Sequence, residues 1–209
     1  MVKIKICGIK NMEEIKILNR YRPDYAGFIF YPESKRYITP LKAHELIKNL
    51  HPAIKKTGVF VNHPADEVNE ISKQLGLDIV QIHGDEKPDY FKNLDTPYWK
   101  VFRIGDKLPD DLDQYQAEAY LFDTLKKNTY GGSGSQFDQS ILNGIDKNYK
   151  VIIAGGLCIV NIAKTLKTII PYCVDINSGV ETDGFKDDEK VMRMIRFIRE
   201  YTGNEVHNE

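Results

Sequence analysis

The chain has 209 residues, 42 % of them hydrophobic and 28 % charged, which is ordinary for a globular protein that buries one core without disulfides or metals. Its 29 Lys and Arg residues balance 30 Asp and Glu residues without a long block of one sign, which argues against nucleic acid or a membrane as a partner. The three cysteines have no C-x-x-C spacing, which argues against a disulfide framework and a zinc site, and the absence of a signal-like or membrane-spanning apolar run favours the cytoplasm.

The first predicted element is a strand that begins at Val2, where apolar and polar residues alternate with a period of two. Cys7 shares a face with Lys5, and Gly8 gives the backbone freedom to turn. The pattern therefore predicts a thiol at the carboxyl end of the strand, above a lysine. A free cysteine is more often only a small buried hydrophobic residue.

Eight short segments rich in β-branched and aromatic residues are predicted strands; they begin near Val2, Tyr25, Lys55, Asp78, Tyr98, Ala119, Lys150 and Tyr172. Successive starts lie 20 to 31 residues apart, which leaves room for one helix and two short loops in each interval. Eight such units without a break in composition favour a closed (β/α)8 TIM barrel, because the eighth strand can pair with the first. We expect residues 1–203 to form this single domain and the polar residues 204–209 to fray.

Helix signals lie between the strands. Asn11 can cap a helix, Thr39 and Pro40 can begin the next, and Gly76 can end a third that follows Pro64. Later intervals carry further start signals at Asp138, Asn161, Asp187, Asp188 and Glu189.

Strand parity predicts which side chains point into the barrel. If Cys7 faces the axis, so do Lys5, Gln81, His83, Asp123, Cys173 and Asp175. The residues that face the helices are then apolar: Ile4, Ile6, Val80, Ile82, Phe122, Val174 and Ile176. A polar barrel mouth is costly to build and is often a functional site.

Two glycine-containing segments predict a phosphate site. Gly155 and Gly156 follow the seventh strand, and Ser178 and Gly179 follow the eighth, where they can open a short extra helix. The carboxyl ends of strands seven and eight are a frequent phosphate position in such barrels. The alternative is that the glycines only relieve packing.

Further candidates lie at other strand ends. Asp123 can present a carboxyl group across the barrel from Cys7, or it can cap a helix. Arg36 can bind a carboxylate or remain solvated, and His83 can bind substrate or be a structural histidine. The segment Tyr130–Gly134, YGGSG, is either a mobile lid or a slack connector.

Taken together, these residues resemble the phosphoribosylanthranilate isomerase family. The resemblance lies in seven motifs that run in order along the chain: KICGIK at 5–10, SKR at 34–36, GVFVN at 58–62, VQIHGDE at 80–86, FD with YGGSGSQFD, IIAGGL at 152–157, and DINSGVE followed by GFKD.

The resemblance implies a barrel that converts N-(5-phosphoribosyl)anthranilate to 1-(o-carboxyphenylamino)-1-deoxyribulose 5-phosphate by an Amadori rearrangement in tryptophan biosynthesis, without metal or organic cofactor. It implies Cys7 as general base, Asp123 as general acid and Arg36 as the residue that holds the anthranilate carboxylate. Two departures are PESKR, where a proline commonly precedes the arginine directly, and Asn177, where serine is commoner. The expected substrate-binding residues are Arg36, His83, Gly155, Gly156, Asp175, Ser178 and Gly179.

Both catalytic roles require shifted protonation. A thiol with a pKa of about 8.5 needs a nearby cation to act as a base at pH 7, and we expect Lys5 to supply it unless Lys5 pairs with Asp175. Asp123 needs burial or the arriving substrate to keep it protonated.

Other functions fit parts of the pattern. A ribulose-phosphate epimerase, an indole-glycerol-phosphate synthase or a non-catalytic phosphosugar sensor would share the phosphate motifs. Cys7 and Asp123 argue against the sensor, because binding alone needs neither. We expect a small phosphosugar as partner, and the chain to be a monomer or a homodimer.

Overall fold

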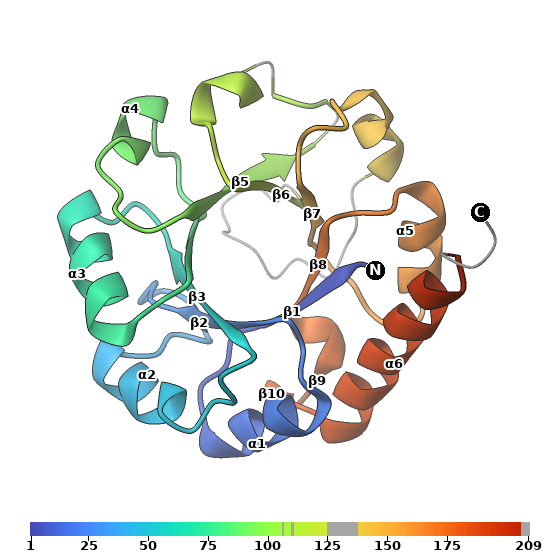
Figure 1. Ribbon diagram of the computed structural model, residues 1–209, viewed down its shortest axis with the longest axis horizontal. Helices are drawn as coiled ribbons and strands as arrows, with labels where there is room; N and C mark the ends of the chain where they lie inside the picture. Colours follow the sequence, from blue (N-terminus) through green and yellow to red (C-terminus); the bar gives the residue numbers. More distant parts are fainter. Residues whose placement is uncertain (106, 110, 125–137, 206–209) are drawn as a thin grey trace.

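The computed structural model describes residues 1–105, 107–109, 111–124 and 138–205. Within them, eight parallel strands close into a barrel in chain order, and β8 pairs with β1 (Figure 1). This arrangement confirms the predicted barrel. The strands are β1 (Lys3–Cys7), β2 (Tyr25–Ile29), β3 (Lys55–Phe60), β4 (Ile79–Ile82), β5 (Tyr98–Ile104), β6 (Ala119–Thr124), β7 (Val151–Ile153) and β8 (Cys173–Ile176).

Helices surround the barrel, and several begin and end at the predicted signals (Figure 1). The Asn11 side chain accepts a hydrogen bond from the Glu14 N–H at 2.9 Å, and Gly76 ends its helix with a left-handed φ of 58°. The α-helices are α1 (Met12–Tyr21), α2 (Pro40–Ile47), α3 (Ala65–Leu75), α4 (Pro88–Phe91), α5 (Ile162–Thr168) and α6 (Asp188–Glu205), and the 3-10 helices are η1 (Leu112–Tyr115), η2 (Gln139–Gly144) and η3 (Ser178–Val180).

The intervals between β4 and β7 differ from the expected pattern of one helix each. In the described residues they contain only the four-residue α4 and the 3-10 helices η1 and η2. Prolines restrict the chain in two of these intervals, at Pro97 and Pro109. Aromatic side chains cover the strands instead. The ring centroids of Phe91 and Tyr98 lie 4.7 Å apart. Those of Tyr115 and Phe102 lie 5.3 Å apart.

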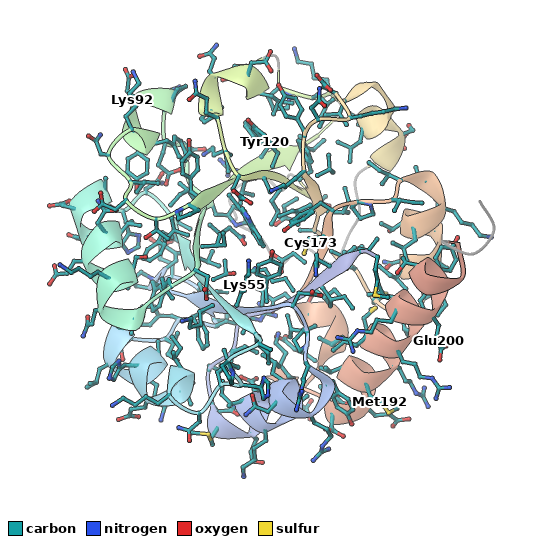
Figure 2. All side chains as sticks on the ribbon, viewed as in Figure 1. Lys55, Lys92, Tyr120, Cys173, Met192 and Glu200 are labelled. Carbon is teal, nitrogen blue, oxygen red and sulfur yellow. The ribbon has the colours of Figure 1, made fainter. Side chains whose placement is uncertain are left out.

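Strand parity divides the core into two parts, of which only the apolar side that faces the helices was predicted. The residues that face the helices, Ile4 and Phe122 among them, pack into one large cluster between barrel and helices. A second cluster fills the barrel below its mouth and consists of Tyr25, Ile79, Trp99, Val101, Ala119, Leu121, Ile152, Ala154 and Cys173. Figure 2 shows Cys173 inside the ring of strands and Glu200 at the outer edge. Because apolar side chains fill the lower barrel, space for a ligand lies at the carboxyl ends of the strands.

A short hairpin after β8 was not predicted. It joins β9 (Glu181–Thr182) to β10 (Phe185–Lys186) as an antiparallel pair, with Lys186 opposite Glu181. Its two-residue turn, Asp183-Gly184, has positive φ at both positions, 52° and 79°, as a type I′ turn requires. An Asp-Gly pair is a known signal for this turn, so the sequence contained the necessary information.

Two predicted segments fall on residues outside the described ranges. They are the Tyr130–Gly134 loop and residues 206–209 of the expected tail, while α6 extends to Glu205. Among the described residues, no helix combines the length and apolar character needed to cross a bilayer.

Candidate active site

One cavity of about 520 Å³ opens at the carboxyl ends of the strands. A cavity of this size suits a small organic ligand. All nine residues expected to form a site line it: Cys7, Arg36, His83, Asp123, Gly155, Gly156, Asp175, Ser178 and Gly179. The structure therefore brings together side chains from strands that are far apart in the sequence.

Cys7 ends β1 with its thiol buried at the cavity floor. A side chain at Gly27 on the neighbouring strand would place its Cβ 2.7 Å from the Cys7 sulfur, so the thiol occupies space that only glycine leaves free. Gly8 then turns the chain with a φ of 81°. Burial raises the pKa of the Cys7 thiol, and the positive charge of Lys5 offsets only part of this effect.

Lys5 favours the Cys7 thiolate, as expected, but it also pairs with Asp175, and burial keeps the pKa of Cys7 above its ordinary value. Lys5 is fully buried, and its Nζ donates a hydrogen bond to Oδ2 of Asp175 at 2.8 Å. Burial opposes the charge on Lys5, but Asp175 and Cys7 outweigh it and raise the pKa of Lys5. The negative charge of Asp175 cancels part of what Lys5 does for the thiolate, since the carboxylate raises the Cys7 pKa.

Asp123 lies on β6, with β7 and β8 between it and Cys7. Burial raises the pKa of its carboxyl group to about 6, although Oδ1 accepts a hydrogen bond from the Thr124 N–H at 2.7 Å. A Cβ on Gly155 would lie 2.9 Å from the same Oδ1. Gly155 thus makes room for the acid, as well as adopting a φ of 86° that favours glycine.

His83 faces Asp123 from the end of β4, with 3.7 Å between Nε2 and Oδ2. Burial, together with the charges of Arg103 and Lys5, lowers the pKa of His83 to about 3. The imidazole is therefore neutral at pH 7. A neutral ring has no positive charge to stabilise the ionised form of Asp123, which is consistent with the raised pKa of that acid.

Arg36 reaches the cavity from the loop after β2. Its Nε and Nη2 donate to the two carboxylate oxygens of Glu181, at 2.8 and 2.6 Å. A Cβ on Gly8 would lie 2.6 Å from Arg36 Cδ, so the arginine packs directly over the turn that follows Cys7. The alternative of a solvated arginine is wrong, because the side chain is only 18 % exposed.

The loops after β7 and β8 form an anion-binding corner. The backbone N–H groups of Gly155, Gly156, Ser178 and Gly179 have no acceptor among the described residues, and all four residues line the cavity. Ser178 begins the predicted short helix, η3. A Cβ on Gly179 would lie 1.8 Å from the Leu157 carbonyl oxygen, so this glycine also lets the two loops pack against each other.

The comparisons with known proteins agree with this geometry. The family model described as N-(5'phosphoribosyl)anthranilate (PRA) isomerase matches residues 4–196. The chain belongs to this family. N-(5'-phosphoribosyl)anthranilate isomerase of Thermoanaerobacter pseudethanolicus is 44 % identical over 203 residues, covering 95 % of this chain and 98 % of the relative. The enzyme of Clostridium acetobutylicum is 43 % identical over 205 residues, which cover 96 % of this chain and 100 % of the relative.

Solved structures of the phosphoribosylanthranilate isomerase family share the fold. The Thermus thermophilus protein superposes with a TM-score of 0.87 at 28 % identity, over 96 % of this chain and 100 % of the other. A family member in complex with reduced 1-(o-carboxyphenylamino)-1-deoxyribulose 5-phosphate superposes with a TM-score of 0.81 at 29 % identity. The match covers 94 % of this chain and 97 % of that one. The Thermotoga maritima protein, described as monomers generated from a dimeric isomerase, superposes with a TM-score of 0.82 at 30 % identity. The match covers 97 % of this chain and 100 % of that one.

Sequence reasoning missed two residues that lie behind Arg36, on the side away from the cavity. Glu181 pairs with Arg36, and Lys186 pairs with Glu181 at 2.6 Å and donates to Asn177 Oδ1 at 2.8 Å. Glu181 and Lys186 lie within the DINSGVE and GFKD motifs, but nothing in the sequence assigned them a partner. The unusual Asn177 therefore has a contact of its own, to a buried lysine.

Proposed function

We propose that this cavity performs the reaction for which the family is named, the isomerisation of N-(5'-phosphoribosyl)anthranilate to 1-(o-carboxyphenylamino)-1-deoxyribulose 5-phosphate, and that Cys7 and Asp123 carry it. One observation supports this most strongly: the thiol and the carboxyl group line one cavity from non-adjacent strands, between a carboxylate-binding arginine and an anion-binding corner. A substrate with a phosphate at one end and a carboxylate at the other fits between them.

Asp123 acts first, as the general acid. It protonates the furanose ring oxygen, and the ring opens to a Schiff base. With a pKa of about 6, raised by burial, the carboxyl group keeps about a tenth of its population protonated at pH 7. An ordinary aspartate would keep about a thousandth. The buried position therefore supplies the proton that the first step needs.

Cys7 acts second, as the general base. It removes the proton from the second carbon of the sugar, which gives an enolamine that tautomerises to the ketone. Because burial raises the pKa of the thiol, the thiolate is scarce in the ligand-free cavity. The protonated Schiff base brings a positive charge next to the sulfur, and this charge both stabilises the thiolate and acidifies the carbon.

The remaining cavity residues position the substrate. Arg36 holds the anthranilate carboxylate with its planar N–H groups, and the phosphate accepts hydrogen bonds from the backbone N–H groups of the loops after β7 and β8. His83, neutral at pH 7, is a hydrogen-bonding partner near Asp123 that adds no charge. Asp175 lies beside them on β8 and holds Lys5.

The test is the loss of anthranilate-type fluorescence when the purified protein meets phosphoribosylanthranilate generated in situ. We expect rapid decay that a chelator does not change and that Cys7→Ser abolishes. Cys158→Ser is the matched control, because that thiol is not among the residues that line the cavity. No decay with folded protein and substrate present would favour a related phosphosugar enzyme or a binding protein without activity.

The expected location and assembly accompany this proposal. We infer that the chain works in the cytoplasm, which cell fractionation checks. The expected oligomeric state is a monomer or a homodimer, and sedimentation velocity at two protein concentrations distinguishes them.

A further inference from the structure

Arg36 already holds a carboxylate. Glu181 accepts hydrogen bonds from Nε and Nη2 of Arg36 through both of its oxygens, at 2.8 and 2.6 Å. A guanidinium has five N–H donors, so three remain, two on Nη1 and one on Nη2. Within the described residues these three donate no hydrogen bond. Glu181 therefore has one of two effects. It competes with the substrate carboxylate for Arg36, or it holds the guanidinium group in the orientation that binds this carboxylate.

The geometry indicates that Glu181 orients Arg36 and does not compete for it. The Glu181 side chain is 7 % exposed, and its Oε1 also accepts from Lys186 Nζ at 2.6 Å. The backbone holds it as well, since Glu181 pairs with Lys186 in the hairpin of β9 and β10. Among the described residues, the lining of the cavity includes Arg36 but neither Glu181 nor Lys186. Glu181 thus lies behind the guanidinium group. If its carboxylate moved away, the buried ammonium group of Lys186 would lose its charged partner.

Charge balance agrees with this arrangement. Lys186 is fully buried and donates to Asn177 O, Asn177 Oδ1 and Glu181, so its positive charge offsets the negative charge of Glu181. Burial alone would raise the pKa of Glu181, but Arg36 and Lys186 outweigh it and lower the pKa to about 2. Within this trio, two cations and one anion leave a net charge of +1, while the buried carboxylate of Glu14, which accepts a hydrogen bond from the Lys186 N–H, also acts on Arg36.

We propose that Glu181 is a positioning residue that fixes the guanidinium plane of Arg36, so that its Nη1/Nη2 edge receives the substrate carboxylate, and that Lys186 neutralises Glu181 so that Arg36 keeps its attraction for that carboxylate. This inference rests on the proposed function of Arg36. It assigns a role to two residues of the DINSGVE and GFKD motifs outside the cavity.

The experiment measures binding of the reduced product analogue and of its counterpart without the ring carboxylate, by calorimetry on the folded protein. Glu181→Gln keeps the shape of the side chain and is expected to weaken the carboxylated analogue about tenfold. The analogue without the carboxylate should change less than about twofold, and in the reaction KM should rise while kcat stays within about twofold. Glu200→Gln, which removes the partner of Arg196 on the outer surface of α6, is the matched control.

A double-mutant cycle tests whether Glu181 acts through Arg36. In an Arg36→Met background, Glu181→Gln should change the affinity less than about twofold, because the group it positions is gone. Glu181→Gln combined with Lys186→Met removes the buried lysine together with its partner and should show the same carboxylate-dependent loss as Glu181→Gln alone. This second variant keeps the test available if Glu181→Gln does not fold.

The outcomes separate the two levels of the proposal. Tighter binding of the carboxylated analogue to Glu181→Gln would overturn the positioning role, because it would mean that Glu181 competes with the ligand. Unchanged binding, with Arg36→Met impaired, would overturn it while leaving the role of Arg36 intact. Arg36→Met without a carboxylate-dependent loss would overturn both.

Discussion

The ammonium group of Lys5 lies 2.8 Å from Oδ2 of Asp175, and both side chains are buried where β1 pairs with β8. This ion pair lies directly below Cys7 and connects the first and last strands of the barrel. Two charges of opposite sign stabilise each other here, so that the loss of either leaves the other uncompensated in the interior. Its consequences for stability and for the thiol can be measured separately.

For stability, Lys5→Met should lower the free energy of unfolding by about 3–5 kcal/mol, because it leaves the Asp175 carboxylate buried without its partner. Urea denaturation measures the change. The matched variant is Lys3→Met, which removes the exposed pair with Asp24 and should cost about 1 kcal/mol or less. Equal losses in the two variants would show that the buried pair has no special weight.

For the thiol, the pH dependence of Cys7 alkylation should have its midpoint above the ordinary cysteine value of about 8.5, because burial raises the pKa. Lys5→Met should move the midpoint higher still, since it removes a positive charge that favours the thiolate. Iodoacetamide labelling followed by mass spectrometry resolves Cys7 from Cys158. A midpoint near pH 7 would contradict the structure, and an unchanged profile in the variant would exclude an influence of Lys5.

Asp123→Asn should lower kcat by at least about 100-fold, because the amide cannot donate the proton that opens the ring. Binding of the reduced product analogue should persist, since the other cavity residues are untouched. Steady-state kinetics and calorimetry check the two statements. Glu118→Gln, just before β6 at the opposite end of the barrel from Asp123, removes an exposed partner of Lys150 and serves as the control. Turnover close to that of the wild type would remove Asp123 from the mechanism.

The raised pKa of Asp123 also gives a pH dependence with a definite sign. The acid form is needed for ring opening, so the rate of that step, measured in a single turnover, should fall as the pH rises through about 6. Stability should fall in the same direction: the folded pKa exceeds the unfolded value of 3.8, so the native state binds the proton more tightly between these values. The loss between about pH 4 and 6 amounts to about 3 kcal/mol, and it should be absent in Asp123→Asn. Denaturation at several pH values would refute this if both proteins behaved alike.

Gly179→Ala should weaken binding of the phosphorylated analogue and destabilise the protein by about 1–3 kcal/mol, since the added Cβ would lie 1.8 Å from the Leu157 carbonyl oxygen and would push the two loops apart. Gly203→Ala is the control, because a Cβ there meets nothing within 4 Å and an alanine favours the helix by about 1 kcal/mol. Thermal denaturation and calorimetry measure both effects. A stable Gly179→Ala with full affinity would show that the loops tolerate the change.

Features that depend on near neighbours could be predicted from the chain alone. Alternation within a strand decided that Cys7, His83 and Asp123 face the axis, since a period of two fixes the side of each residue. Asn11 and Gly76 decided helix ends for the same reason, because caps act within one turn. Repeated units of similar length then decided the closed barrel, and with it the single edge at which the candidate site had to lie.

The partners of the buried charges and the protonation of Cys7 and Asp123 depend instead on how distant segments pack. Arg36 and Glu181 are 145 positions apart, and Lys5 and Asp175 are 170 apart, so no local pattern connects them. The pKa values of Cys7 and Asp123 follow from burial, which is a property of the packed barrel and not of a strand. The sequence could therefore name the acid, the thiol and the arginine, but the environment that prepares each of them exists only when distant segments pack together.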